Sequence, residues 1–446
     1  MTDIPRRTAA RTAKLASLPL GVAGRAVGGW GRRLAGGDSK QISAQLMAKS
    51  AEQLFEVLGE LKGGAMKFGQ ALSVFEAAIP DEYAAPFRES LVKLQSAAPP
   101  MPPADVHRVL AEQFGRGWRA RFQEFDETPA AAASIGQVHR AVWRDGRDVA
   151  VKVQYPGAEE ALRSDLRQLS RMSRVMQPLM PGLEIKPLVT ELRDRMEEEL
   201  DYRDEAENQR IFAAAFEGDE HVKVPRVVAS APKAMVSEWV TGRKLSDVIT
   251  RGDQTERDAV AALLAEFLYS SPTRVGLLHA DPHPGNFQVL DDGRLMVVDF
   301  GAVARLPDGL PRPLSIMVRL ALENRSDDLL ELLRNEGFVR AGSKLGAREA
   351  EAYLSPFTDP LREENFRFNR RWLQSQAERV GDLRSPQFNT GLELNLPPQY
   401  LLIHRVTMGT LAVLCQLDVD VPLRGIVRQW QPWIFDAEDE SAGQST

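Results

Sequence analysis

The chain contains a single cysteine, Cys415, among its 446 residues. It therefore cannot form a disulfide within itself or build a metal site from several cysteines. This cysteine usage fits a reducing compartment, and the bacterial cytoplasm is the default expectation.

Long uninterrupted apolar runs are also missing. Arg25 interrupts the apolar residues near the start, and His404 and Arg405 interrupt them near the end. No run approaches the roughly 18 to 20 residues that a spanning helix needs, so we expect no transmembrane helix. With 43% apolar and 26% charged residues, the sequence predicts a globular chain of about two or three domains.

Acidic residues are scarce in the first 40 positions, which contain eight basic residues but only two acidic ones, Asp3 and Asp38. That stretch carries a formal charge of +6, which leaves −12 on the rest of a chain whose total is −6. Three interpretations stay open for this leader: an amphipathic segment on anionic lipid, an organelle transit peptide, or a disordered basic tail. Pro19, Gly21 and Arg25 break the apolar centre that a secretory signal would need.

Composition and periodicity divide the rest of the chain. Apolar residues at three- and four-residue intervals predict an N-terminal helical extension over 41–103, which ends in a proline-rich linker at 99–103. We expect a mixed segment at 104–240, a mainly helical segment at 241–436 and an acidic tail at 437–446. Within them the patterns predict strands at Gln137–Trp143, Asp148–Gln154 and Ala234–Trp239, helices at 158–178 and 186–216, and a strand–turn–strand at Asn286–Asp299. The expected fold class is α+β.

A lysine ends one predicted strand, in Val149-Ala150-Val151-Lys152. Upstream, Ala131–Val138 keeps the last glycine and the valine of the kinase phosphate loop G-x-G-x-x-G-x-V, but alanines replace its first two glycines. Small residues still let backbone N–H groups approach a phosphate, although methyl groups stiffen the loop. We therefore expect this loop to hold phosphate differently from a glycine-rich one.

Two further motifs follow in kinase order. His279–Asn286 matches H-x-D-x-x-x-x-N, and Asp299-Phe300-Gly301 supplies D-F-G. In such a pair one carboxylate orients or deprotonates the attacking hydroxyl, while the amide and the second carboxylate hold the magnesium that bridges the nucleotide phosphates. His279 is expected to anchor the backbone, and His283 is left without a role.

Two charged segments offer partners for these groups. On the helix predicted around Asp201, the side chain of Glu205 shares a face with Asp201, whereas Glu199 points elsewhere. Lys67 and Gln70 project from one face of the N-terminal helix beside Gly69. Read alone, each of these segments is also an ordinary solvated helix surface.

Six segments follow one another in the chain: K-x-G-Q at Lys67–Gln70, the alanine-rich loop, Val149–Lys152, E-x-D at Glu199–Asp201, Asp281–Asn286 and Asp299–Gly301. Together they resemble the UbiB/AarF family of atypical kinase-like proteins, which includes mitochondrial coenzyme Q kinase-like ATPases. The resemblance covers about residues 40–310. It implies a two-lobed, protein-kinase-like fold whose N-terminal extension lies over the active site. The sequence shows no A-P-E element after Gly301 and no C-terminal membrane anchor of the kind some members carry.

The resemblance implies an ATPase or atypical kinase that binds ATP or ADP with Mg²⁺ and supports isoprenoid quinone biosynthesis. It implies contact with anionic membrane, lipid or quinone precursors and quinone-biosynthesis proteins, and no nucleic acid. Its location would be the cytoplasm, the inner face of the membrane, or the mitochondrial matrix if the leader is a transit peptide. It assigns catalytic roles to Lys67, Gln70, Lys152 and Asp281; nucleotide binding to Ala131, Ala132, Ala133, Ser134, Ile135, Gly136, Val138, Lys152, Glu199, Asp201 and Glu205; and the metal to Asn286 and Asp299. Either Glu205 or Glu199 would pair with Lys152.

Two other functions remain open. His279–Asn286 is also similar to the catalytic loop of aminoglycoside and choline kinases, which lack the Lys67–Gln70 extension. Alternatively, the chain is a non-catalytic nucleotide- or lipid-binding partner protein, against which the retention of Lys152, Asp281, Asn286 and Asp299 argues.

Overall fold

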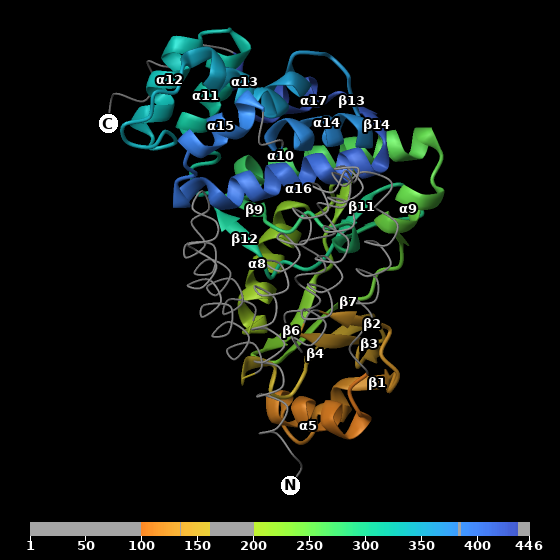
Figure 1. Ribbon diagram of the computed structural model, residues 1–446. Coiled ribbons are helices and arrows are strands. Elements are labelled where there is room, and N and C mark those ends of the chain that lie inside the picture. Colours follow the sequence, from red (N-terminus) through yellow and green to blue (C-terminus); the bar gives the residue numbers. More distant parts are fainter. Residues whose placement is uncertain (1–99, 134, 161–199, 382–384, 436–446) are drawn as a thin grey trace, which may run out of the picture. The chain divides into compact units, whose positions relative to one another are not determined.

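The computed structural model describes residues 100–133, 135–160, 200–381 and 385–435 (Figure 1). These residues fall into two compact units. The first contains the described residues up to Arg203 together with Val228–Glu238. The second contains Asp204–Val227 and the described residues from Trp239 onward. Each unit is described below by itself.

The first unit is built on a six-stranded sheet in the order β1-β3-β4-β7-β6, with β2 paired to β3. Adjacent strands in the pairs β1–β3, β2–β3, β3–β4 and β4–β7 run antiparallel. The strands are β1 (Phe122–Phe125), β2 (Ala131–Ala133), β3 (Gly136–Trp143), β4 (Asp148–Gln154), β6 (Val227–Ala231) and β7 (Ala234–Glu238).

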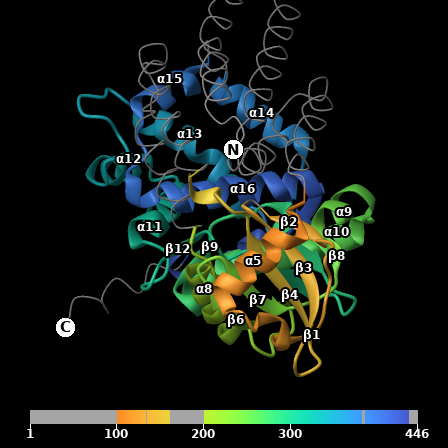
Figure 2. The same cartoon turned by 90° about the horizontal axis from the view of Figure 1, so that it is seen from below.

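One face of this sheet is covered by helix α5 (Pro103–Phe114), which crosses β4 and β7 (Figure 2). Pro103 occupies the start of the helix, where a missing N–H costs nothing, so the proline-rich stretch ends at a helix instead of a loop. The helix buries Val109 and Leu110 in one cluster with Val149, Val151 and Val153 of β4. Because alternate residues of a strand face opposite sides, the lysine of β4 lies on the other face.

The second unit combines short strands with many helices. A four-stranded sheet has the order β5-β11-β10-β8, and two further pairs are β12-β9 and β13-β14. The strands are β5 (Val222–Lys223), β8 (Arg243–Lys244), β9 (Leu277–His279), β10 (Phe287–Val289), β11 (Leu295–Val297), β12 (Val303–Arg305), β13 (Phe366–Phe368) and β14 (Val419–Val421). The helices are α8 (Tyr202–Ala215, from Asp204 on), α9 (Leu245–Arg251), α10 (Gln254–Val275), α11 (Arg312–Leu322), α12 (Ser326–Asn335), α13 (Ala347–Thr358), α14 (Arg370–Gly381), α15 (Pro386–Glu393), α16 (Leu401–Leu417) and α17 (Leu423–Trp430).

Two long helices, α10 and α16, run through this unit (Figure 1). Helix α10 begins where the Asp253 side chain accepts a hydrogen bond from the Glu256 N–H, and it ends at Gly276 in the left-handed conformation. The segment Pro398–Leu417 is apolar and long enough to pass as a membrane span by length and composition, but 61% of it is buried within the structure. It packs against α9, α10, α14 and β13, as a core helix does.

The expected α+β fold class is confirmed. The strands predicted around Gln137–Trp143, Asp148–Gln154 and Ala234–Trp239 are β3, β4 and β7, and Asn286–Asp299 contains the β10–β11 hairpin with Gly293 at its turn. The predicted helix over 186–216 is described as helix from Tyr202 on. The basic leader, the N-terminal extension before residue 100, most of the predicted helix over 158–178 and the acidic tail at 437–446 lie outside the described residues. Strands β13 and β14 were not predicted, because three-residue pairs leave almost no periodicity.

Candidate active site

In the first unit, strand register places the predicted nucleotide-binding residues in one row. Ala131 of β2 pairs with Val138 of β3, and Val138 pairs with Lys152 of β4. Directly paired residues project to the same face of a sheet, so these three side chains stand side by side on the face away from α5. The segment expected to be a phosphate loop is thus largely a hairpin, with Ala133 opposite Gly136.

Gly136 is required by a close approach of main chains. A Cβ atom at this position would lie 2.3 Å from the Val153 carbonyl oxygen and 2.8 Å from the Tyr202 hydroxyl. Both are far inside van der Waals contact, so no other residue fits without moving the strand or the tyrosine. This explains physically why the glycine of the phosphate-loop pattern is kept here although the alanines replace the others.

Tyr202 is a site residue that the sequence analysis passed over. The Lys152 ammonium lies 5.0 Å from the centre of its ring, a cation–π distance. Its N–H donates to the Pro232 carbonyl at 2.9 Å, and Gln154 Nε2 donates to the Leu200 carbonyl at 3.0 Å. These two bonds hold the chain at Leu200 and Tyr202 against the end of β4 and the turn between β6 and β7. Only its place directly after Asp201 could have drawn attention to it.

Asp201 itself is turned toward a neighbour in sequence. Its carboxylate accepts hydrogen bonds from Nε and Nη2 of Arg203, at 3.0 and 2.6 Å, and from the Arg203 N–H. The Arg203 bonds lower the pKa of Asp201. Glu205 is buried and belongs to the second unit, whereas Lys152 belongs to the first, so their pairing stays a prediction. Four predicted site residues lie outside the described ranges: Lys67, Gln70, Ser134 and Glu199.

In the second unit, His279 anchors the loop that carries the predicted catalytic aspartate. The imidazole is fully buried; Nε2 lies 2.9 Å from the Asp299 carbonyl oxygen and Nδ1 3.4 Å from the Asp281 N–H nitrogen. One contact needs a donor and the other an acceptor, which a neutral ring with its proton on Nε2 provides. Burial lowers the pKa of His279, in keeping with that form. The expected backbone-anchoring role is confirmed.

Asp281 and Asn286 are joined within one tight loop. Asn286 Nδ2 donates to the Asp281 carbonyl at 3.0 Å and to Asp281 Oδ2 at 3.2 Å. The ring nitrogen Nδ1 of His283 accepts a bond from the Gly285 N–H and caps the short turn at Pro284–Asn286, which gives that histidine a structural place. Since the Asn286 amide nitrogen is used by Asp281, its amide oxygen is the atom that can face a cation.

Asp299 adopts a backbone conformation that non-glycine residues rarely take, with φ of 63°. Such a conformation costs on the order of 1 to 2 kcal/mol and persists where the surroundings enforce it, often at functional sites. Here Oδ1 accepts a bond from the Gly301 N–H at 3.3 Å, and Asn208 of α8 donates to the Phe300 carbonyl at 3.1 Å. The Phe300 ring is fully buried against Phe212 and His279.

Helix α16 approaches the same loop from the C-terminal part of the chain. Arg405 Nη2 lies 3.8 Å from Asp281 Oδ1, whose side chain is only 10% exposed. A Cβ atom at Gly409, one turn further, would lie 2.6 Å from Cγ of Pro282. The glycine therefore lets α16 pack directly on the loop, and the arginine places a positive charge beside its aspartate. No sequence signal linked either residue to Asp281, because the contact is purely tertiary.

The donor set suits magnesium. Asn286 offers an amide oxygen and Asp299 a carboxylate, and Mg²⁺ is commonly held by one or two carboxylates together with substrate phosphates and waters. Within the described ranges, no three His, Cys, Asp or Glu side chains cluster as a self-sufficient metal site. A cation here would therefore depend on the oxygens of a bound phosphate.

Large parts of the chain match known proteins. Residues 93–333 match the ABC1 atypical kinase-like domain, more than half of the chain. The chain is 29% identical to the atypical kinase coq-8, mitochondrial, of Caenorhabditis elegans, covering 76% of this chain and 46% of that protein. It is 32% identical to AarF domain-containing protein kinase 1 of Xenopus tropicalis, covering 63% and 53%. A solved structure from Mycobacterium tuberculosis, described as the complex of Rv3197 with erythromycin, is 47% identical with a TM-score of 0.68, over 90% of this chain and all of that one.

Proposed function

This chain belongs to the UbiB/AarF family of atypical kinase-like proteins, and we propose that it binds ATP with Mg²⁺ and transfers the terminal phosphoryl group to water or to a small molecule. The observation that carries the proposal is the loop in which Asp281 is hydrogen-bonded both to Asn286 and to the His279 ring, while that ring also bonds to the Asp299 carbonyl. The loop presents the buried Asp281 carboxylate bonded to Asn286, and His279 ties Asp299 to it.

The proposed roles follow from the geometry within each unit. In the first, Lys152 beside Val138 and Ala131 would meet nucleotide phosphates. In the second unit, the Asp281 carboxylate would accept the proton of the attacking hydroxyl group. The oxygen of that hydroxyl group would form the new bond to phosphorus while the bond from phosphorus to the leaving oxygen of ADP breaks. Mg²⁺, held by Asn286 and Asp299, would supply charge neutralisation on the phosphates.

Asp299→Asn tests the assignment directly. Asparagine tolerates the left-handed conformation and can keep the bond to the Gly301 N–H, so the fold is expected to persist while one negative charge is lost from the metal site. Titration calorimetry should show magnesium-dependent ATP binding abolished. Asp292→Asn, at an exposed hairpin turn where the Asp292 carboxylate bonds to Arg294, is the matched control. Unchanged binding of ATP with magnesium in Asp299→Asn would refute the proposed site.

The finer proposal concerns the process that is served. The resemblance to coenzyme Q kinase-like proteins supports a role in isoprenoid quinone biosynthesis, in the cytoplasm or at a membrane surface. ATP turnover should then rise when anionic liposomes and phenolic quinone precursors are added. Turnover that responds to neither, but to an added aminoglycoside or choline, would favour a small-molecule phosphotransferase; magnesium-dependent binding without turnover would favour a non-catalytic partner protein.

A second candidate function comes from the mycobacterial relative. Its structure is described as a complex with erythromycin, and 47% identity across 90% of this chain supports testing the same ligand here. We expect erythromycin to bind in calorimetry, and we would repeat the titration with ATP and magnesium present. Absence of heat at concentrations that saturate ATP would reject macrolide binding for this chain while leaving the nucleotide proposal intact.

A further inference from the structure

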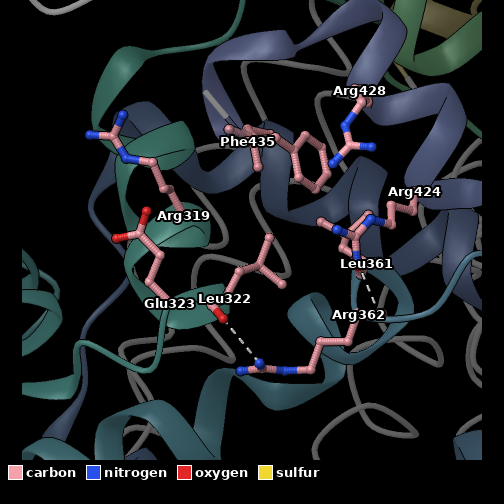
Figure 3. Close-up of a pocket in the computed structure, with 9 residues that line it drawn as sticks. Arg319, Leu322, Glu323, Leu361, Arg362, Arg424, Arg428 and Phe435 are labelled. Atoms are coloured by element: carbon pink, nitrogen blue, oxygen red, sulfur yellow. Dashed lines mark hydrogen bonds between the residues drawn. The ribbon is translucent and has the colours of Figure 1, made fainter. Parts of the chain in front are cut away.

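A cavity of about 330 Å³ lies in the second unit, and none of the residues assigned to the nucleotide lines it (Figure 3). Its walls come from four places in the chain: α11, the segment at Leu361 and Arg362, α17, and the turn that ends at Phe435. The volume falls within the range of small-molecule sites and far exceeds what a single inorganic ion needs.

The charge of the lining is strongly one-sided. Four arginines and one acidic residue, Glu323, are among the lining residues; the arginines are Arg319, Arg362, Arg424 and Arg428. Arg424 and Arg428 stand four residues apart on α17, where like charges share a face and repel. Such a concentration of positive charge is relieved by a bound anion.

Two of these guanidinium groups are held in place by the main chain. Arg362 donates to the carbonyl oxygens of Ala321 and Leu322, at 2.6 and 3.2 Å, where α11 ends. The carboxylates of Glu351 and Asp359 lie 3.8 and 3.9 Å from its guanidinium, so Arg362 is partly neutralised and Arg424 and Arg428 carry the anion site. Arg424 Nη1 donates to the Arg362 carbonyl at 3.1 Å. The buried Nε of Arg424 makes no hydrogen bond within the described part of the chain, and the carboxylate of Glu364 beside it, at 3.7 Å, is largely exposed.

Arg428 is the most available cation of the set. It is exposed, and among the described residues no carboxylate lies within 4.0 Å of its guanidinium. Its contact is instead the ring of Phe435, 4.8 Å away, and Arg424 lies 5.6 Å from the same ring. Figure 3 shows both guanidinium groups beside this ring, with Leu361 next to them. Positive charge and an apolar wall thus occur together.

We propose that this cavity binds a phosphate monoester whose other end is apolar or aromatic. Guanidinium groups pair with phosphate oxygens through two parallel bonds, and several of them match a dianion. The apolar groups Phe435, Ile434, Leu322 and Leu361 would cover the rest of the ligand. Both a soluble ester and a lipid headgroup carry this chemistry.

The test uses phenyl phosphate as a soluble probe, and vesicles of phosphatidylcholine with or without phosphatidic acid as a lipid probe, on the full chain. We expect Arg428→Gln to weaken binding by about tenfold or more, the worth of one charge-assisted contact. Because Arg428 is exposed and bonds to no main-chain group within the described residues, the variant should unfold at the wild-type temperature. Arg348→Gln, at an exposed arginine of α13 outside the cavity, should bind like wild type.

The outcomes separate the sources and the alternatives. Arg428-dependent binding of phenyl phosphate supports a soluble ester, and Arg428-dependent binding of only the vesicles with phosphatidic acid supports a headgroup. Equal binding by wild type and Arg428→Gln, or no binding of either probe, would overturn the proposal. The sequence continues with Asp436, Glu438, Asp439 and Glu440, outside the described residues. Binding seen only after these four are changed to amides would overturn it too, because the chain's own carboxylates would then be the anions these arginines meet.

Discussion

The predicted site residues of the two units are positioned by different means. In the first unit, Ala131, Val138 and Lys152 are aligned by strand register, and the alanine hairpin is exposed at the sheet edge. In the second unit, Asp281 and Asn286 are buried within hydrogen-bonded loops around His279. The site residues of the first unit therefore lie on one face of a regular sheet, whereas those of the second unit form a hydrogen-bonded cluster in a core.

The difference teaches where substitutions should be tolerated. A side chain placed by register can change without unsettling its neighbours, since the main-chain ladder stays intact. A side chain that belongs to a buried network leaves its partners unpaired when it is lost. Four predictions break or sharpen this contrast, from the largest expected effect to the smallest.

Phe300→Ala should cost about 3 to 5 kcal/mol of unfolding free energy, because it removes a fully buried ring that packs on Phe212 and His279. Lys152→Met, in the first unit, should change the unfolding free energy by less than about 1 kcal/mol. Urea unfolding of both variants checks the contrast. Similar losses in the two would show that the first part is as interlocked as the second.

Gly136→Ala should cost about 2 to 3 kcal/mol, because the added methyl group meets the Val153 carbonyl oxygen at 2.3 Å. Gly117→Ala is the matched control: its φ is −85° and nothing lies within 4 Å of the added atom, so it should be neutral or slightly stabilising. Midpoints of urea unfolding report both. A stable Gly136→Ala would mean that the strand and Tyr202 adjust freely.

The first unit also contains a buried histidine, His139. Its Nδ1 lies 2.7 Å from the Asp126 carbonyl oxygen, its Nε2 faces the Gln137 amide nitrogen at 2.8 Å, and burial lowers its pKa. In the unfolded chain the His139 imidazole is therefore protonated near pH 6.5, whereas in the folded chain it stays neutral at that pH. Stability is fully present above pH 6.5 and falls below it, by up to about 1.4 kcal/mol per pH unit, until the lowered pKa is reached.

His139→Gln should remove this part of the pH dependence while lowering stability at pH 7.5, which urea titrations at pH 7.5 and 5.5 would show. His404→Gln serves as the comparison, because His404 is exposed on α16 and makes none of the contacts of His139, so the slope should persist in that variant. A slope that is unchanged in His139→Gln would rule out the neutral form as the cause.

The smallest effect is expected at Arg405, whose side chain on α16 contacts Asp281 of the buried loop. Arg405→Gln should reduce ATP turnover about fivefold, which corresponds to roughly 1 kcal/mol in the activation free energy, because Asp281 loses its neighbouring positive charge. The loss should be in kcat, with little change in ATP affinity. Stability should hardly change, since the arginine is 41% exposed. Arg405→Lys should restore most of the rate, and Arg371→Gln, at an exposed position of α14, should match wild type. Full activity in Arg405→Gln would make the contact incidental.

Much of the site could be predicted because its determinants are local. The alternation in Asp148–Gln154 predicts a strand. Asp292-Gly293 predicts the turn of the hairpin that connects Asn286 to Asp299. The fixed spacing of Asp281, Asn286 and Asp299 works because a short loop and a hairpin are themselves local structures. The same holds for His279, whose two contacts lie within twenty residues.

Local patterns in the sequence therefore account for the order of motifs, the strands that carry them and the chemistry of each side chain. Packing alone brings the Tyr202 ring next to Lys152, places α16 on the Asp281 loop through Arg405 and Gly409, and gathers arginines from α11, α17 and the chain between them around one cavity. These contacts join residues far apart in the chain. Their positions depend on how whole elements pack, and a local pattern of residues does not contain that information.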